Sequence, residues 1–141
     1  FRLERDSSEL FEQMKEHPHR SLDWKIDCST GSLGSGITIA VGMALVNPNQ
    51  QVYCIVSDGE CAEGSFWEAL RFMNSHSVSN LHLYVNLNGF SGYDKVDVKS
   101  LANQIQSINK NVIKMIIKST SVVHLLDLFM ILKKNYYEED Y

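Results

Sequence analysis

Two polar residues follow two hydrophobic segments, and their types suit a hard metal ion. Asp58 and Gly59 come directly after a strand predicted over residues 52–56, and Asn88 follows a strand predicted over residues 81–86. Because parallel strands place their C-terminal ends on one edge of a sheet, where ligands bind, we expect the two side chains to meet there. Carboxylate and amide oxygens suit Mg²⁺ or Ca²⁺. Gly59 would let the backbone pass close to a phosphate.

Strands and helices alternate along the chain. Ser35 and Gly36 open a predicted helix of small and apolar residues, which ends at Asn47-Pro48. This alternation predicts an α/β fold, a parallel β-sheet flanked by helices on both faces. The other predicted elements are helices over residues 7–16, 64–76, 98–109 and 119–135, and a third strand over residues 112–117.

The residues around Asp58 and Asn88 resemble a known cofactor motif. In thiamine-diphosphate enzymes a Gly-Asp-Gly segment is followed, after one βαβ unit, by Asn. The segment SDGECAEGSFWEA at residues 57–69 is similar to the transketolase form of that motif. This chain also resembles transketolases in a second stretch, STGSLGSG at residues 29–36 followed by AVGMA at residues 40–44. The chain thus resembles the N-terminal, diphosphate-binding domain of the transketolase family, truncated or split, and we expect the thiamine-diphosphate-binding fold.

This resemblance implies a cofactor, thiamine diphosphate, bound through Mg²⁺ or Ca²⁺. It also implies a metal site formed by Asp58, Asn88 and the backbone carbonyl of Phe90. The cofactor-binding residues that it implies are Gly31, Leu33, Gly34, Gly59, Glu60 and Asn88. The residues alone also allow a plainer interpretation, because Asp-Gly and Asn-Gly are common in turns, and a Gly/Ser run can simply lead into a helix.

Two further residues are expected at the reacting end of the site. Glu63 matches an acidic residue that transketolases place in a carboxylate network near the subunit interface. His17 precedes a proline, as does a family histidine that faces cofactor and substrate. The resemblance implies catalytic roles for both. Glu63 could equally be an acidic residue that complements the N-terminal dipole of a helix.

Several departures from the family pattern leave more than one function open. Ser57 stands where the motif has its first glycine, and the chain contains no pyrimidine-binding domain, which supplies the glutamate that activates the cofactor. The first hypothesis is the cofactor- and metal-binding part of a transketolase-like enzyme, which moves a two-carbon ketol unit between sugar phosphates and needs a pyrimidine-binding domain from elsewhere. The alternatives are a non-catalytic cofactor-binding or interaction module, and a fragment of a deoxyxylulose-phosphate synthase or ketoacid dehydrogenase.

Composition limits the remaining classes. The 141 residues predict a single, partial domain over residues 1–141 with a loose tail at 136–141, and the initial Phe suggests a fragment. A net charge of −4 and a pI near 5.7 argue against nucleic acid. The longest apolar run, residues 122–132, is too short to span a membrane. Three cysteines without a CxxC pair suggest a reducing, cytoplasmic location, and the incomplete site predicts a homo- or hetero-oligomer.

Overall fold

The computed structural model describes most of the chain between residues 26 and 109. The described residues are 12, 17, 19–23, 26–91 and 94–109, with the backbone of 113–117. The chain divides into two compact units, one formed by Phe1–Gly31 with Ser119–Tyr141 and the other by Ser32–Lys118. The predicted helices over 7–16 (apart from Glu12) and 119–135 and the predicted tail at 136–141 lie outside the described residues.

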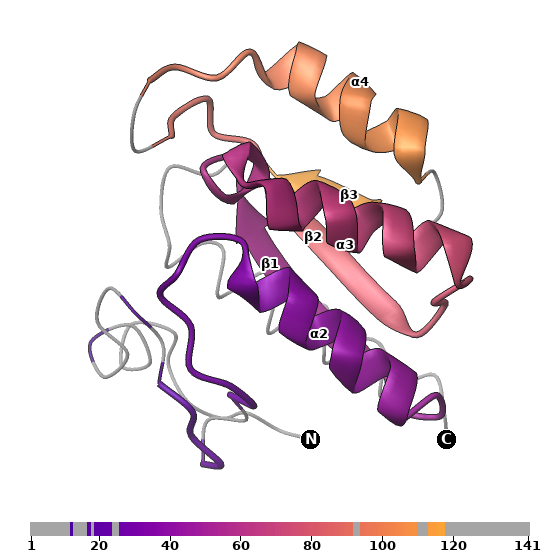
Figure 1. Ribbon diagram of the computed structural model, residues 1–141. Helices are drawn as coiled ribbons and strands as arrows, with labels where there is room; N and C mark the ends of the chain where they lie inside the picture. The colour runs from indigo at the N-terminus through magenta and orange to yellow at the C-terminus, as the bar shows by residue number, and fades with distance from the viewer. Residues whose placement is uncertain are drawn as a thin grey trace. The chain divides into compact units, whose positions relative to one another are not determined.

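The unit Ser32–Lys118 is built on a three-stranded parallel sheet (Figure 1). Strands β1 (Val52–Ser57), β2 (Leu81–Asn86) and β3 (Ile113–Ile117) lie side by side in that order. The β1–β2 register pairs Ser57 with Asn86, so both strands end at the same edge. The parallel α/β architecture predicted from the alternation of elements is therefore confirmed.

Helices connect these strands, as parallel pairing requires. Helix α2 (Ser35–Val46) precedes β1, the short 3₁₀ helix η1 (Glu60–Ala62) and α3 (Gly64–Ser75) lie between β1 and β2, and α4 (Val98–Ile108) lies between β2 and β3. The predicted bounds of α2, α3 and α4 differ from these by at most two residues. Asp97 caps α4 by accepting hydrogen bonds from the backbone N–H groups of Lys99 and Ser100, both at 3.1 Å.

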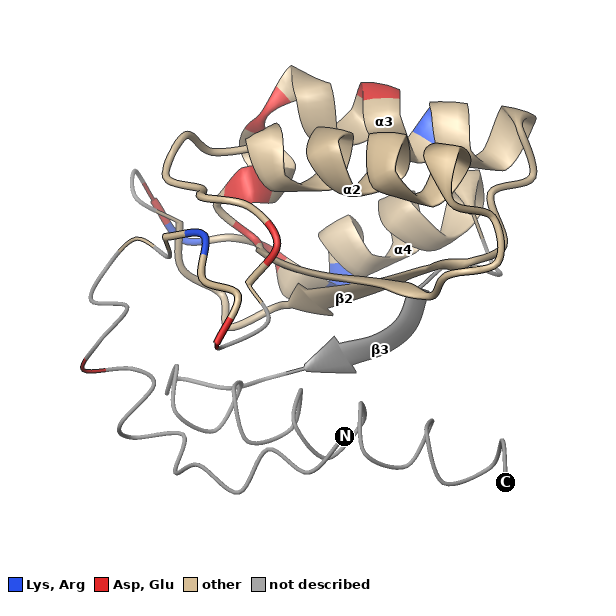
Figure 2. Cartoon of the chain, turned by 90° about the horizontal axis from the view of Figure 1, so that it is seen from below, with Lys and Arg blue, Asp and Glu red and all other residues tan. Residues whose placement is uncertain are grey.

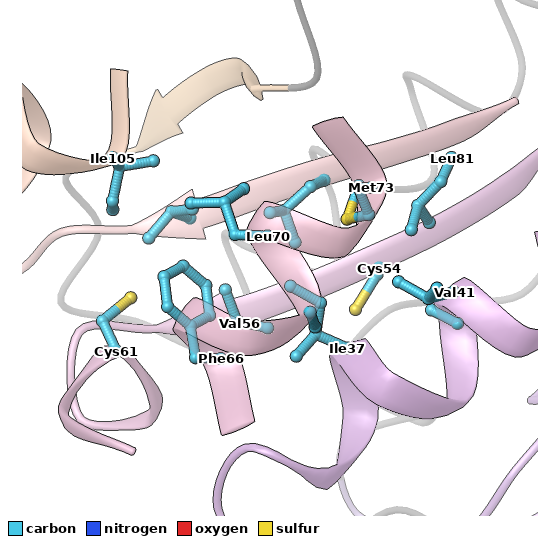
Figure 3. Close-up of a cluster of buried hydrophobic side chains, with 14 of the residues drawn as sticks. Ile37, Val41, Cys54, Val56, Cys61, Phe66, Leu70, Met73, Leu81 and Ile105 are labelled. Carbon is cyan, nitrogen blue, oxygen red and sulfur yellow. The ribbon is translucent and has the colours of Figure 1, made fainter. Parts of the chain in front are cut away.

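One hydrophobic core lies between the described helices and one face of the sheet (Figures 2 and 3). On β2 every second residue points to this face, because successive side chains of a strand point to opposite faces of the sheet. Large side chains of α2 and α3, including Ile37, Phe66 and Leu70, fill the space between the layers. The core residues contributed by the strands and by α4 are Val52, Cys54, Val56, Leu81, Leu83, Val85, Leu101 and Ile105.

Strand β2 is buried along its whole length, including the residues that point away from this core. His82 lies on that second face, where its Nε2 is 2.6 Å from Oε1 of Gln51 and its ring stacks on Tyr53 with a centroid distance of 4.8 Å. A strand buried on both faces is typical of a parallel sheet. The described residues include no helix on that face, so the predicted helices on that side stay a prediction.

Helix α2 packs one side on the sheet and exposes apolar side chains on the other. Ala40 and Ala44 are buried, whereas Leu45 and Val46 are 46% and 78% exposed. Its C-terminal end is held by Asn80, whose buried side-chain nitrogen lies 3.0 Å from the carbonyl oxygen of Ala44. None of the described helices is long and apolar enough to cross a membrane.

Candidate functional site

Asp58 follows the last residue of β1 and is buried, with 1% of its surface exposed. Its Oδ2 accepts a hydrogen bond of 2.7 Å from the backbone N–H of Gly89, at the end of the neighbouring strand. Its Oδ1 is also buried but receives no hydrogen bond from the described chain. An unsatisfied buried carboxylate oxygen is unfavourable, because burial removes water without replacing it. Asp58 therefore has one oxygen ready for a cation.

The turn after β2 lies against Asp58. Gly89 has φ +89°, a conformation that favours glycine, and its carbonyl accepts a hydrogen bond of 3.0 Å from Val96 N–H. The half-buried Asn88 turns its Oδ1 toward the backbone N–H of Phe90, at 2.9 Å. A carbonyl oxygen has two lone pairs, so Asn88 Oδ1 can still bind a cation. The predicted meeting of the segments that follow β1 and β2 is thus observed, while their role as metal ligands stays a prediction.

The start of α2 packs against the start of α3. Gly34, the N-cap of α2, is buried with φ +78°, and a Cβ at this position would overlap Ser65 Oγ and lie 2.9 Å from Glu63 Cβ. Ser65 Oγ donates to the Gly34 carbonyl at 3.3 Å. Glu63 is the half-buried N-cap residue of α3, and Leu33 is 44% exposed next to Gly34. Three predicted site residues therefore share one loop-to-helix junction.

Glu60 contacts the end of β1. Its Oε2 accepts hydrogen bonds from the backbone N–H of Ser57 at 2.9 Å and from Ser57 Oγ at 3.5 Å. Burial raises the pKa of Glu60, and these hydrogen bonds oppose the rise. The contact between Glu60 and Ser57 was not predicted, although Ser-x-x-Glu is the pattern in which a glutamate reaches back to a backbone N–H.

The two residues that flank Asp58 in the motif, one conserved in type and one replaced, have simple structural outcomes. Gly59 has φ −62° and ψ −39°, right-handed helical values that do not require glycine. Ser57 occupies a β-strand position, and its hydroxyl is turned toward Glu60. The serine that replaces the first motif glycine therefore fits without backbone strain.

The remaining predicted residues belong to the unit that contains Phe1–Gly31. His17 is exposed, and a Cβ at Gly31 would lie 3.5 Å from its Cγ. Within this unit Arg20 N–H donates to Ser29 Oγ at 2.8 Å. The structure thus brings His17 and Gly31 together. In the other unit it brings Asp58 to the turn that contains Asn88 and Phe90, and Gly34 to Glu63.

The oxygen donors around Asp58 fit a magnesium or calcium ion. The described residues hold no cluster of three or more His, Cys, Asp or Glu side chains that could chelate a metal by themselves. Mg²⁺ does not need such a cluster, because it is usually held by one or two carboxylates together with phosphate oxygens and water. Asp58 Oδ1, Asn88 Oδ1 and the carbonyl of the exposed Phe90 are the donors available at this edge.

Similarity to known proteins agrees with this chemistry. Residues 7–78 match the family described as "Thiamine pyrophosphate enzyme, C-terminal TPP binding domain". Transketolase-like protein 2 of Homo sapiens is 37% identical over 84 residues, which cover 56% of this chain and 13% of that protein. Transketolase of Homo sapiens is 40% identical over 67 residues, which cover 44% of this chain and 11% of that protein. The chain therefore spans only a small part of these relatives.

The family match also bears on the expected domain. Its description names a C-terminal binding domain, so the expected N-terminal label is not confirmed. The thiamine-diphosphate class and the likeness to transketolases, inferred from residues 29–44 and 57–69, are confirmed. Because the match at residues 7–78 covers half of the 141-residue chain, this protein belongs to the thiamine pyrophosphate enzyme family.

Proposed function

We propose that this chain binds the diphosphate of thiamine diphosphate through a divalent cation, as part of a transketolase-like enzyme that transfers a two-carbon ketol unit between sugar phosphates. The observation that carries the proposal is the buried Asp58 Oδ1, which receives no hydrogen bond from the described residues at the edge where β1 and β2 end. A cation there would compensate the carboxylate and could also bind phosphate oxygens. The names of the transketolase relatives supply the reaction class.

Each candidate residue has a defined task in this proposal. Asp58 provides the charged ligand, and Asn88 and the carbonyl of Phe90 provide neutral oxygen ligands. Gly34 allows the close packing that shapes the junction between α2 and α3. Leu33 offers an exposed apolar side chain next to that junction, suited to the uncharged part of a cofactor.

The reacting end of the site needs groups beyond the metal ligands. Thiamine diphosphate, when bound, supplies a ring that stabilises carbanions. His17 and Glu63 are the titratable residues that we assign to this end, with His17 facing substrate and Glu63 near a subunit interface. The glutamate that activates the cofactor would come from a pyrimidine-binding domain or subunit. A cytoplasmic homo- or hetero-oligomer is the assembly that we propose.

Calorimetry can test the binding step without any turnover. The chain is titrated with thiamine diphosphate in Mg²⁺, in Ca²⁺ and in EDTA. We expect saturable binding with either cation and none in EDTA, because Asp58 would otherwise face the diphosphate without a cation between them. Thiamine, which lacks the diphosphate, is the matched control ligand and should bind weakly under all three conditions. Equal affinity for both ligands would contradict the proposed diphosphate site.

A second candidate function is a cofactor-binding module without catalysis. The observation that favours it is Ser57, which stands where the family motif has its first glycine. Mixing the chain with a protein that carries a pyrimidine-binding domain distinguishes the two functions. Ketol transfer by the mixture supports the enzyme, whereas metal-dependent cofactor binding that never leads to turnover supports the module.

A further inference from the structure

Asp58 contacts both the end of β2 and the turn that follows it. Its backbone N–H donates to the carbonyl of Asn86 at 3.2 Å, one step beyond the last paired residues of β1 and β2. Its side-chain Oδ2 then accepts from the backbone N–H of Gly89 at 2.7 Å. This distance is typical of a charged acceptor, whose hydrogen bonds are about twice as strong as those between neutral groups. The carboxylate therefore continues the connection between the two segments where the sheet ends.

The turn that receives this contact has two further hydrogen bonds of its own. The carbonyl of Gly89 accepts from the backbone N–H of Val96 at 3.0 Å. Asn88 Oδ1 accepts from the backbone N–H of Phe90 at 2.9 Å. Both backbone polar groups of Gly89 are thus used within the protein, one by Asp58 and one by Val96. Of these three contacts, only the one with Asp58 joins the turn to the end of β1.

We propose that Asp58 is a positioning residue as well as a cation ligand: its Oδ2 holds the Asn88–Phe90 turn against the end of β1, and its Oδ1 remains for the cation. The hydrogen bond to Oδ2 also fixes Oδ1, because the two oxygens belong to one planar group. The neutral donors of the turn are then in place without any ligand. The part of this inference that concerns cation and cofactor rests on the proposed function, whereas the hold on the turn is a property of the protein alone.

Gly89 has the backbone conformation that this arrangement needs. Its φ of +89° is disfavoured for residues with a side chain. Space is not the restriction, since a Cβ at this position would lie 3.6 Å from Cγ2 of Val98, an ordinary contact distance. A substitution of Gly89 can therefore disturb the turn through its backbone while every proposed cation ligand is retained.

The first test measures hydrogen exchange of single backbone amides by NMR, in the full chain with EDTA and without cofactor. Asp58→Ala should raise the exchange rate of the Gly89 amide by about 10- to 100-fold, because a hydrogen bond to a charged acceptor is lost. Asp58→Asn removes the charge but keeps an acceptor oxygen, so it should restore much of that protection. The Val52 amide, which donates to the Asn80 carbonyl at the opposite end of β1, is the internal reference and should not change.

Controls separate the loss of this contact from a general loss of stability. Glu68→Ala removes a carboxylate from an exposed residue of α3 and should leave the Gly89 amide unchanged. General destabilisation by Asp58→Ala would raise exchange at Val52 as well, so the change at Gly89 is taken relative to the change at Val52. Unchanged protection of Gly89 in Asp58→Ala would overturn the positioning role. An unprotected Gly89 amide in the unsubstituted chain would overturn it without any variant.

The second test measures cofactor affinity in Mg²⁺ by calorimetry at a temperature where every variant is folded. Gly89→Ala should bind thiamine diphosphate about tenfold more weakly or worse, because the strained φ displaces the turn. Gly42→Ala is the matched control, since nothing lies within 4 Å of its Cβ position, and should bind like the unsubstituted chain. Full affinity in Gly89→Ala, despite faster exchange of the amide at position 89, would show that the position of the turn does not matter to the cofactor. If the unsubstituted chain binds no cofactor, the proposed function fails, while the exchange data still judge the contact of Asp58 with Gly89.

Discussion

Asp58 has two carboxylate oxygens with different surroundings, and this difference allows a sharp prediction. Asp58→Asn can keep the 2.7 Å hydrogen bond from Gly89 with its amide oxygen. It removes a buried charge, whose Oδ1 receives no hydrogen bond within the part of the chain that the structure describes. We expect metal-dependent cofactor binding to be lost. The metal-free protein should be as stable or more stable, by up to about 1–3 kcal/mol, because a neutral amide replaces a buried charge.

Calorimetry and urea unfolding, both performed on the same samples, check the two halves of that prediction. Glu68→Gln is the control for removal of one negative charge at an exposed site. Full cofactor affinity in Asp58→Asn would refute the metal site. A large loss of stability in the same variant would show that Asp58 is a structural residue whose second oxygen has a partner.

The sequence predicted some residues of the site and missed others, for a physical reason. Asp58 and Asn88 could be placed together because parallel strands end at a common edge. The contact of Glu60 with Ser57 follows a local sequence pattern. The helix that begins there, however, is a three-residue 3₁₀ helix, which is too short to give a helix signal in the sequence. The contact of Gly34 with Ser65 depends on how two helices pack, which no local pattern encodes.

At the scale of elements, alanine substitution should have opposite effects at two glycines, Gly34 at the N-cap of α2 and Gly42 within α2. Gly34→Ala should lower the free energy of unfolding by at least about 1–3 kcal/mol, because φ +78° is strained for alanine and the new Cβ would overlap Ser65. Gly42→Ala is the matched control, since nothing lies within 4 Å of its Cβ position. It should stabilise the helix by about 0.5–1 kcal/mol.

Urea unfolding of both glycine variants provides the measurement, with the midpoint and slope compared to those of the unsubstituted chain. Equal effects of Gly34→Ala and Gly42→Ala would mean that the close packing of α2 on α3 does not hold in solution. Cofactor affinity should also fall in Gly34→Ala and stay unchanged in Gly42→Ala.

The C-terminal end of α2 depends on a single buried amide. The side-chain nitrogen of Asn80 lies 3.0, 3.1 and 2.8 Å from the carbonyl oxygens of Ala44, Asn47 and Gln50. Asn80→Ala should destabilise the protein by about 1–3 kcal/mol, because buried acceptors lose their donor. Asn103→Ala, at an exposed position of α4, is the control, and urea unfolding should show a change within about 0.5 kcal/mol. Equal stability of both variants would contradict this role of Asn80.

The bounds of these elements could be predicted well because several local signals agree. Asn47-Pro48 ends α2, and Asp97 caps α4. Periodicity could not show which side of α2 faces the sheet, since the helix is apolar on nearly every side. Its buried side, with Ile37, Ala40, Val41 and Ala44, became known only from the packing.

At the scale of the whole molecule, the exposed side of α2 predicts self-association. Leu45 and Val46 are exposed next to one another at the end of this helix. Exposed apolar patches usually mark interfaces or aggregation sites. Light scattering at micromolar concentration should therefore detect oligomers, and the double substitution Leu45→Gln, Val46→Gln should reduce their population. A monomer that binds no hydrophobic dye would contradict the prediction.

The chain alone should not transfer ketol units, even where it binds the cofactor. It covers 13% of transketolase-like protein 2 of Homo sapiens, and the glutamate expected to activate the cofactor is not among the residues assigned to this site. Acid–base help of that kind is typically worth about 10² to 10⁴ in rate. A coupled assay with saturating cofactor and Mg²⁺ should therefore give no turnover above background. Asp58→Asn, prepared in the same way, reveals contaminating enzyme, since activity present in both samples cannot come from the proposed metal site. Turnover by the pure chain that disappears in Asp58→Asn would show that this chain carries the complete catalytic machinery by itself.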